Sequence, residues 1–504
     1  MRAAAEYTFP RRNQMVRHTP CLLAAVLLTV GWAGTSMAET GQADGLNAPR
    51  DRAPADRVAQ GIADEALRAL VEETLERNPD LRAGFARARA AAQKAPQVAS
   101  LPDPTAEATA FLAPPETRVG PQRLMLGYSQ PLPWLAKLDL REEAAVHGAV
   151  ALEHGVQADR LRLVTEVRRL YHELAFLDRS RETAATFLEH LIQHEEVAQA
   201  RYATGVGSTQ AVLKLQAEIT RAERALVDLD LGEAALRARL NSLRDRPAAT
   251  PVARGSLPTA IEEAALEAGK LAALARSSRP ELRAAAAGLA RTDTLERLAR
   301  MASRPDFNVG VTYTLVTPRD DEAARLLAPA GNGNDVFGVR GGVTLPLRRR
   351  SRAAAVQEAL DLRSHAVDER RAAELTVESE VGDLTQRLPL AWRRLRLLED
   401  LLVVQAEEAL ESAEAGYIAG SLNTLDLFDA EHVLFEAQTA TDRARADYLI
   451  GLAELEGAVG RSLAVLGEEP ALRPARQSSR LRRQPAGTPA HPVGGLAEKG
   501  GTER

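Results

Sequence analysis

The sequence predicts a mainly α-helical protein with a small β part, built from two similar halves. Aromatic residues make up only 4% of the 504 residues, while alanine, leucine, glutamate and arginine are abundant. Such a composition is typical of long packed helices. Several motifs occur twice, between 201 and 215 residues apart. Short runs that alternate apolar with small or polar residues stand between the helical stretches, which is the pattern of β-strands.

The composition also excludes several classes of protein. A single cysteine, Cys21, rules out a disulfide scaffold and any zinc or iron–sulfur site built from cysteines. A net charge of -5 on a chain of this length gives no reason to expect a nucleic acid partner. The sequence contains no P-loop, dinucleotide fingerprint, G-x-S-x-G or H-E-x-x-H motif. It therefore predicts no enzyme, no catalytic residue and no cofactor.

The N-terminus has the pattern of a secretory signal peptide. Residues 21–33 form an apolar run that is short for a bilayer span, with arginines before it and small residues after it. Cleavage after Ala38 would remove residues 1–38. A membrane anchor is the alternative. An exported chain without another long apolar helix is either soluble outside the inner membrane or crosses the outer membrane with β-strands.

Paired motifs define the two halves. Residues 78–83 (NPDLRA) match 279–284 (RPELRA), and Tyr202–Gly205 (YATG) match Tyr417–Gly420 (YIAG). A period this long is not that of a solenoid, so it indicates two similar halves of one domain. We expect a flexible segment, a first repeat, a linker, a second repeat and a disordered basic tail, over residues 39–60, 61–243, 244–258, 259–465 and 466–504.

Each half is predicted to contain an Ala-rich helix, two strands, a very long helix, a tight turn and a return helix. The helices are expected in that order over 62–95, 138–203 and 208–243, and again over 259–302, 350–417 and 423–462. A helix of about 65 residues would be on the order of 100 Å long, and it needs a partner along its whole run. Because the return helix covers only half of it, the Ala-rich helix is expected to cover the other half.

The strand candidates carry one apolar face and one small or polar face. In the clearest run, Phe307, Val309 and Val311 alternate with Asn308 and Gly310. The other runs lie near 105–112, 124–129 and 337–345. Their length suits tilted membrane strands, and an ordinary two-sided sheet on a soluble domain is the alternative. Four strands cannot close a barrel, so a barrel in a membrane would have to be shared between chains.

Together these motifs resemble the TolC-like outer-membrane efflux factor family and its heavy-metal efflux branch. The resemblance covers about 60–465 and rests on the duplicated helix starts, the SLPDP and SRPDF strand entries, GYSQPLPW at 127–134, and the RYATGVGST and GYIAGSLNTLDLFDAE turns. It implies a homotrimer in outer-membrane lipid. In that trimer three chains share a twelve-stranded transmembrane β-barrel and a long helical tunnel (a trimeric α-barrel) in the periplasm.

The same resemblance implies a passive efflux duct. Its partners would be a periplasmic membrane-fusion adaptor and an inner-membrane resistance-nodulation-division pump or ABC transporter. The QPLPWLAK junction looks most like members paired with heavy-metal pumps, so metal cations, or else drugs, are the expected cargo. A periplasmic coiled-coil adaptor or scaffold without a channel is the alternative, although an adaptor would have one helical hairpin rather than two.

The two turns between long and return helices are the strongest candidate sites. They comprise Gly205, Val206, Gly207 and Ser208 in the first half, and Gly420, Ser421, Leu422 and Asn423 in the second. Glycine gives such a turn the backbone freedom it needs, and Ser208 can cap the next helix. The resemblance makes these turns the tips that dock the adaptor, with Val206 and Leu422 as exposed apolar contacts. Plain connectors are the alternative.

Just after the second turn, Asp426 and Asp429 share one helix face. The resemblance matches them to the acidic rings at the tunnel constriction, where three chains would place carboxylates around a narrow pore that concentrates cations. Solvated aspartates near a helix N-terminus are the alternative. Leu422 stands where some members carry a cationic residue that locks the gate by ion pairing. The resemblance therefore does not imply a locked resting pore in this protein.

Two further patterns concern aromatic and histidine residues. Tyr128 and Trp134, at the second strand and its end, would suit an aromatic belt at the membrane interface, with core packing as the alternative. His190 and His194 are four residues apart on a helix, a spacing that can hold a metal. Because no third ligand is evident, we predict no metal site.

Overall fold

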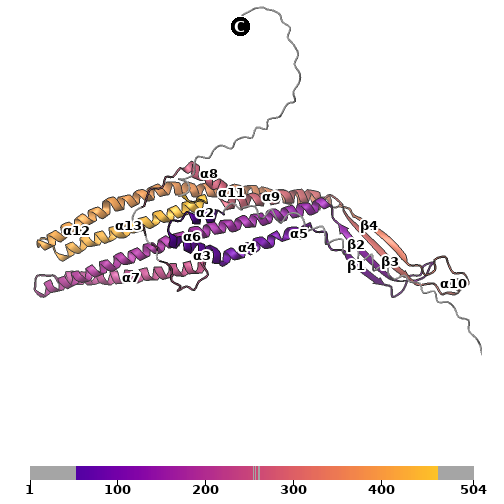
Figure 1. Ribbon diagram of the computed structural model, residues 1–504, viewed down its shortest axis with the longest axis horizontal. Coiled ribbons are helices and arrows are strands. Elements are labelled where there is room, and N and C mark those ends of the chain that lie inside the picture. Colours follow the sequence, from indigo (N-terminus) through magenta and orange to yellow (C-terminus); the bar gives the residue numbers. More distant parts are fainter. Residues whose placement is uncertain (1–52, 254, 256, 259–260, 464–504) are drawn as a thin grey trace, which may run out of the picture. The chain divides into compact units, whose positions relative to one another are not determined.

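The computed structural model describes residues 53–463, apart from 254, 256, 259 and 260. The predicted signal peptide and basic tail lie outside the described residues. Within them the chain is mainly helical, with a single four-stranded sheet. Helical hairpins extend away from this sheet (Figure 1). The mainly α fold with a small β part is therefore confirmed.

Two very long helical segments form the frame. Helix α6 (Leu135–Ala203) is continuous over 69 residues. In the second half, α11 (Arg349–Leu397), the π-helical turn η2 (Leu398–Leu402) and α12 (Val403–Ile418) follow one another. Both long helices were predicted, but the π-helical turn was not.

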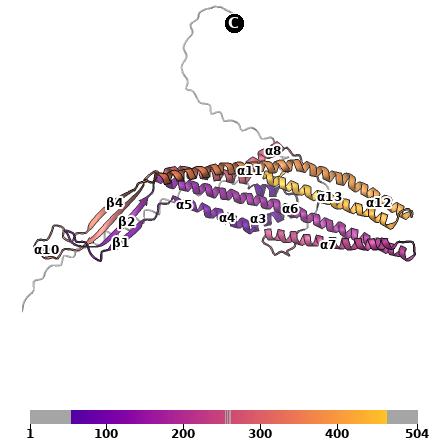
Figure 2. The ribbon, with the colours of Figure 1, turned by 180° about the vertical axis from the view of Figure 1, so that it is seen from behind.

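The return helices complete two hairpins, and they match the predicted ranges closely. Helix α7 (Thr209–Leu243) packs along the half of α6 near the turn, and α13 (Thr424–Val459) packs on α12, α11 and α6. Seen from behind, α7 lies beside one half of α6 while α4 and α5 lie beside the other (Figure 2). This arrangement confirms that two shorter partners cover the long helix end to end.

The Ala-rich helices differ from the prediction because each is interrupted. The first is split into α3 (Glu65–Arg77), α4 (Pro79–Ala92) and α5 (Lys94–Ala99), and the second into α8 (Ala268–Ser278) and α9 (Pro280–Met301). Two of the three breaks precede Pro79 and Pro280, because proline has no N–H to continue a helix and starts one instead. Asn78 caps the new start by accepting the Leu81 N–H at 3.0 Å. The third break lies at Gln93, between α4 and α5.

Two boundaries also need correction. Residues 54–60 form helix α2 (Pro54–Gln60), with Ala55 and Val58 buried, although a flexible segment was expected there. The described residues between 257 and 267 are not helical, so the second Ala-rich helix begins later than 259.

The main hydrophobic core lies where α2 and α3 meet the middle of α6. Apolar side chains recur at helical spacing along one face of α6, and this face is buried at Leu161, Val164, Val167, Leu170 and Leu174. Burying each such side chain stabilises the fold by about 1.5–3 kcal/mol. Tyr171 joins this core and donates its hydroxyl hydrogen to Asp64 at 2.8 Å.

The sheet is an antiparallel meander of β1 (Thr105–Ala110), β2 (Gln122–Leu132), β3 (Asp306–Val316) and β4 (Val336–Thr344). Its register places Leu126 opposite Tyr313, and Tyr313 opposite Phe337, so the predicted apolar faces form one surface. Among the described residues, β1 and β4 each pair on one side only. The short helix α10 (Glu322–Leu326) lies in the β3–β4 loop.

None of the helices in the described part of the chain is both long and apolar enough to cross a membrane.

Candidate functional site

The two hairpin turns have the same backbone design. Gly205 and Gly420 adopt φ of 80° and 74°, in the left-handed region that favours glycine. In the first turn, the N–H groups of residues 206 and 207 donate to the Arg201 carbonyl, and in the second those of residues 421 and 422 donate to the Gly416 carbonyl. Ser208 then caps α7 and Asn423 caps α13. The duplicated sequence therefore gives two equivalent tips.

The apolar side chains at the tips are not equivalent. Val206 is 76% exposed, as expected for a docking contact. Leu422 is only half-buried because it folds back onto Gly416, where an added Cβ would lie 2.8 Å from its Cδ1. The expectation of an exposed Leu422 is therefore wrong. Ile418, two residues before Gly420, is 85% exposed and was missed by the sequence analysis.

Asp426 and Asp429 are both exposed, but they have different partners. The Asp426 carboxylate accepts the Asn423 N–H at 3.0 Å, which completes a capping box at the start of α13. Asp429 forms an ion pair with Lys214 of α7 at 2.9 Å, so it links the two hairpins. The structure thus adds Lys214 to the predicted acidic pair.

The duplication contains a signal for this pairing that the sequence analysis missed. The offset of 215 residues that relates Tyr202 to Tyr417 also relates Lys214 to Asp429. Equivalent positions on the two return helices therefore carry opposite charges. Because the tips lie side by side, these equivalent positions meet.

A second contact between the hairpins involves the two histidines. His194 Nε2 lies 2.8 Å from Glu431 Oε2 on α13, and His190 Nδ1 lies 3.8 Å from Glu431 Oε1. No group of three or more potential ligand side chains among the described residues is arranged to hold a metal ion. In this structure the two histidines contact the second hairpin.

The junction between sheet and helices is built around Asp306. Its carboxylate accepts the backbone N–H of Trp134 at 2.9 Å and the ammonium of buried Lys137 at 2.8 Å. The Trp134 ring packs against Phe307, with centroids 6.4 Å apart, and stays partly exposed. Tyr128 is half-buried within β2. The proposed membrane-interface role of these two aromatic residues stays a prediction.

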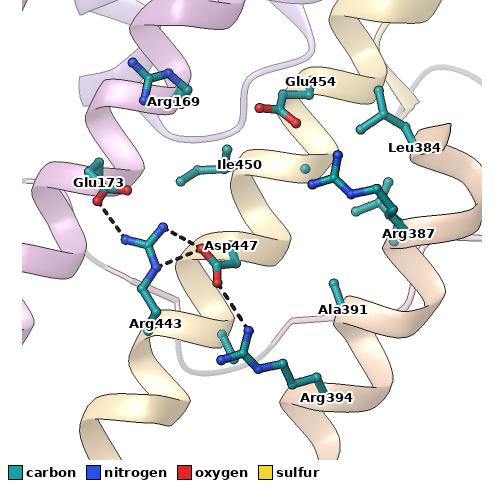
Figure 3. Close-up of a pocket in the computed structure, with 13 residues that line it drawn as sticks. Arg169, Glu173, Leu384, Arg387, Ala391, Arg394, Arg443, Asp447, Ile450 and Glu454 are labelled. Atoms are coloured by element: carbon teal, nitrogen blue, oxygen red, sulfur yellow. Dashed lines mark hydrogen bonds and ion pairs between the residues drawn. The ribbon is translucent and has the colours of Figure 1, made fainter. Parts of the chain in front are cut away.

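A cavity of about 450 Å³ lies between α6, α11 and α13 (Figure 3). Arg443 of α13 bridges two carboxylates, donating to Glu173 of α6 at 2.7 Å and to Asp447 at 2.5 and 2.8 Å. Arg394 of α11 lies 3.8 Å from Asp447 on the other side. This network joins three helices through residues far apart in sequence, and sequence reasoning did not predict it.

Comparisons with known proteins agree with this architecture. The family model described as outer membrane efflux protein matches residues 70–244 and 271–461. The outer membrane protein TolC of Vibrio cholerae is 30% identical over 120 residues, 24% of this chain and 25% of that protein. The cobalt-zinc-cadmium resistance protein CzcC of Cupriavidus metallidurans is 29% identical over 232 residues, 43% of this chain and 50% of that protein. The matched segments thus span a quarter and a half of these relatives.

The fold also matches solved structures. The outer-membrane channel OprN superposes with a TM-score of 0.67 at 20% identity, covering 81% of this chain and 93% of that one. At this identity the match shows the shared fold. The family model covers both halves of the duplication and most of the chain. The chain therefore belongs to the outer membrane efflux protein family, as an outer-membrane protein whose long helices extend into the periplasm.

Proposed function

We propose that the chain is the outer-membrane channel of a tripartite efflux system, acting as a passive duct from the periplasm to the exterior. In this proposal it works as a homotrimer. Three four-stranded sheets close a twelve-stranded transmembrane barrel, and the helical hairpins of three chains enclose a periplasmic tunnel. The helices of one chain cannot surround a pore alone, because they form two neighbouring hairpins.

The sheet is the observation that carries this proposal. Large apolar side chains are exposed on its outer face, among them Val309, Phe337 and Val339. Unpaired strand edges and exposed apolar faces are costly for a protein that works alone. In a bilayer the apolar face contacts lipid, and β1 of one chain can pair with β4 of the next so that no edge is left open.

Outer-membrane fractionation, gel migration with and without heating, and planar-bilayer recording test this proposal together. We expect a heat-sensitive trimer in the outer-membrane fraction that forms stable conducting channels. A soluble monomer without conductance would overturn the duct and favour a periplasmic adaptor or scaffold instead.

We infer that the hairpin tips dock a periplasmic membrane-fusion adaptor, which connects the duct to an inner-membrane resistance-nodulation-division pump or ABC transporter. The exposed side chains of Val206 and Ile418 support this inference, because apolar groups at the end of a helical hairpin suit contact with another protein. The other turn residues, including Gly207, Ser421 and Leu422, shape the backbone that presents them.

We further infer that Asp426 and Asp429 line the pore constriction. Their position directly after a tip supports this placement, and a ring of such carboxylates would favour cations. Heavy-metal cations are our proposed cargo, supported by the similarity to a cobalt-zinc-cadmium resistance protein over half of its length. Deleting the gene and restoring it should lower and then restore growth on zinc, cobalt or cadmium salts. Unchanged growth on all three would argue against metal cargo.

A further inference from the structure

A second cavity lies between α6, α12 and α13, in the half of the hairpins near the tips, with a volume of about 280 Å³. Its apolar wall includes Phe187 of α6 and Phe435 of α13, whose rings stack with centroids 4.4 Å apart and planes 11° apart. Leu410 of α12 adds to this wall. We call it the Phe187 cavity.

A carboxylate stands at the wall of the Phe187 cavity. The side chain of Glu431 is only 11% exposed. Its Oε2 is occupied by His194 at 2.8 Å, but its Oε1 lies 3.8 Å from His190 Nδ1, which is longer than a hydrogen bond. That oxygen can therefore face a further positive group.

Arg179, which also lines the cavity, does not neutralise this carboxylate. Arg179 is paired with Glu182 at 2.6 Å and with Asp442 at 3.4 Å. Because these two carboxylates balance the charge of Arg179, the negative charge of Glu431 makes the cavity electronegative. The rings of Phe187 and Phe435 each turn one face to the other, and the outward face of the stacked pair acts in the same sense, because the face of an aromatic ring attracts cations.

We propose that the Phe187 cavity binds a hydrophobic organic cation, of the kind in which a quaternary ammonium group carries an aromatic or alkyl body. Such a group has no N–H to donate, so it is recognised by aromatic faces and a nearby carboxylate rather than by directional hydrogen bonds. The two phenylalanine rings would contact the body and the ammonium methyl groups, while Glu431 balances the charge. The site lies within one chain, so its occupancy depends neither on the proposed trimer nor on the proposed duct.

Titration calorimetry on the full-length protein in lipid nanodiscs tests this site, with benzyltrimethylammonium as the probe. We expect saturable binding to the wild-type protein, weakened about tenfold or more by Phe187→Leu and by Glu431→Gln. Glu436→Gln is the matched control, because Glu436 lies on the same helix, is exposed, and does not line the cavity. It should bind like the wild type, and so should Asp429→Asn at the proposed pore.

Two other probes separate cation recognition from simpler binding. Benzyl alcohol has an aromatic body without charge, and Mg²⁺ has charge without an apolar body, so neither should compete with benzyltrimethylammonium at equal concentration. Absence of binding to the wild type, equal binding of benzyl alcohol, or unchanged affinity in Glu431→Gln would overturn the proposal. If Phe187→Leu does not assemble, Phe435→Leu tests the other ring of the stacked pair in the same way.

Discussion

Replacing Lys214 with glutamine should change ion selectivity far more than stability. The Lys214 and Asp429 side chains are 38% and 63% exposed, and ion pairs at such exposure contribute about 0.2–1 kcal/mol. One such pair therefore shifts the equilibrium between a closed and an open pore less than about sixfold, which is too little to lock the pore alone. Removing the ammonium groups, however, leaves Asp429 in every chain without its countercharge, so the proposed constriction becomes more negative.

Reversal potentials in planar bilayers under a salt gradient measure this effect. We expect Lys214→Gln to raise the cation-over-anion permeability ratio, and Asp429→Asn to lower it. Lys270→Gln is the control, because Lys270 is also exposed and ion-paired but lies on α8. Equal selectivity in the Lys214 variant and the control would refute the placement of Asp429 at the constriction.

Three further predictions concern acid stability, the junction and the tips. Burial and the charge of Arg168 lower the pKa of His172 from 6.5 to about 4, so the unfolded chain binds a proton that the folded chain excludes between these values. Stability should therefore fall by roughly 3 kcal/mol per chain as the pH drops from 6.5 to 4. When unfolding by denaturant is measured at both pH values, His172→Gln should lose less stability at low pH than the wild type does. The control His365→Gln, at an exposed site, should lose as much stability as the wild type. Lys137→Met leaves Asp306 without its ammonium partner and should cost about 1–3 kcal/mol in thermal unfolding, whereas Lys94→Met on an exposed site should cost little. Val206→Asp should weaken cross-linking to a co-expressed adaptor about tenfold while conductance persists, and an unchanged yield relative to Val146→Asp would argue against docking at this tip.

Much of the fold could be predicted because it depends on periodicity and length. The buried face of α6 follows from apolar residues at helical spacing, and the common face of the strands follows from alternation. The breaks before Pro79 and Pro280 were missed although proline at a helix start gives a local signal. The π-helical turn at Leu398–Leu402 has no comparable signal in the sequence.

The candidate site was predicted less completely, for a different physical reason. The turns could be located from glycine and the repeat, because these features are local. The contacts of His194 with Glu431 and of Arg443 with Glu173 join residues 237 and 270 positions apart. They depend on how α13 packs against α6, which periodicity alone does not determine. The proposed barrel depends in addition on other chains.

The Lys214–Asp429 pair shows what divergence after a duplication can achieve. Two identical halves would place the same residue at equivalent positions of the two return helices, and these positions meet at 2.9 Å between side chains. Two aspartates or two lysines there would repel each other, by an amount similar to what an exposed ion pair gains. Opposite charges remove this repulsion while the turns before them keep their shared backbone design. The charge-swapped variant with Lys214→Asp and Asp429→Lys should therefore keep wild-type stability, whereas Lys214→Asp alone should lower the free energy of unfolding by about 1 kcal/mol. Equal stability of the single and double variants would show that the two side chains do not interact.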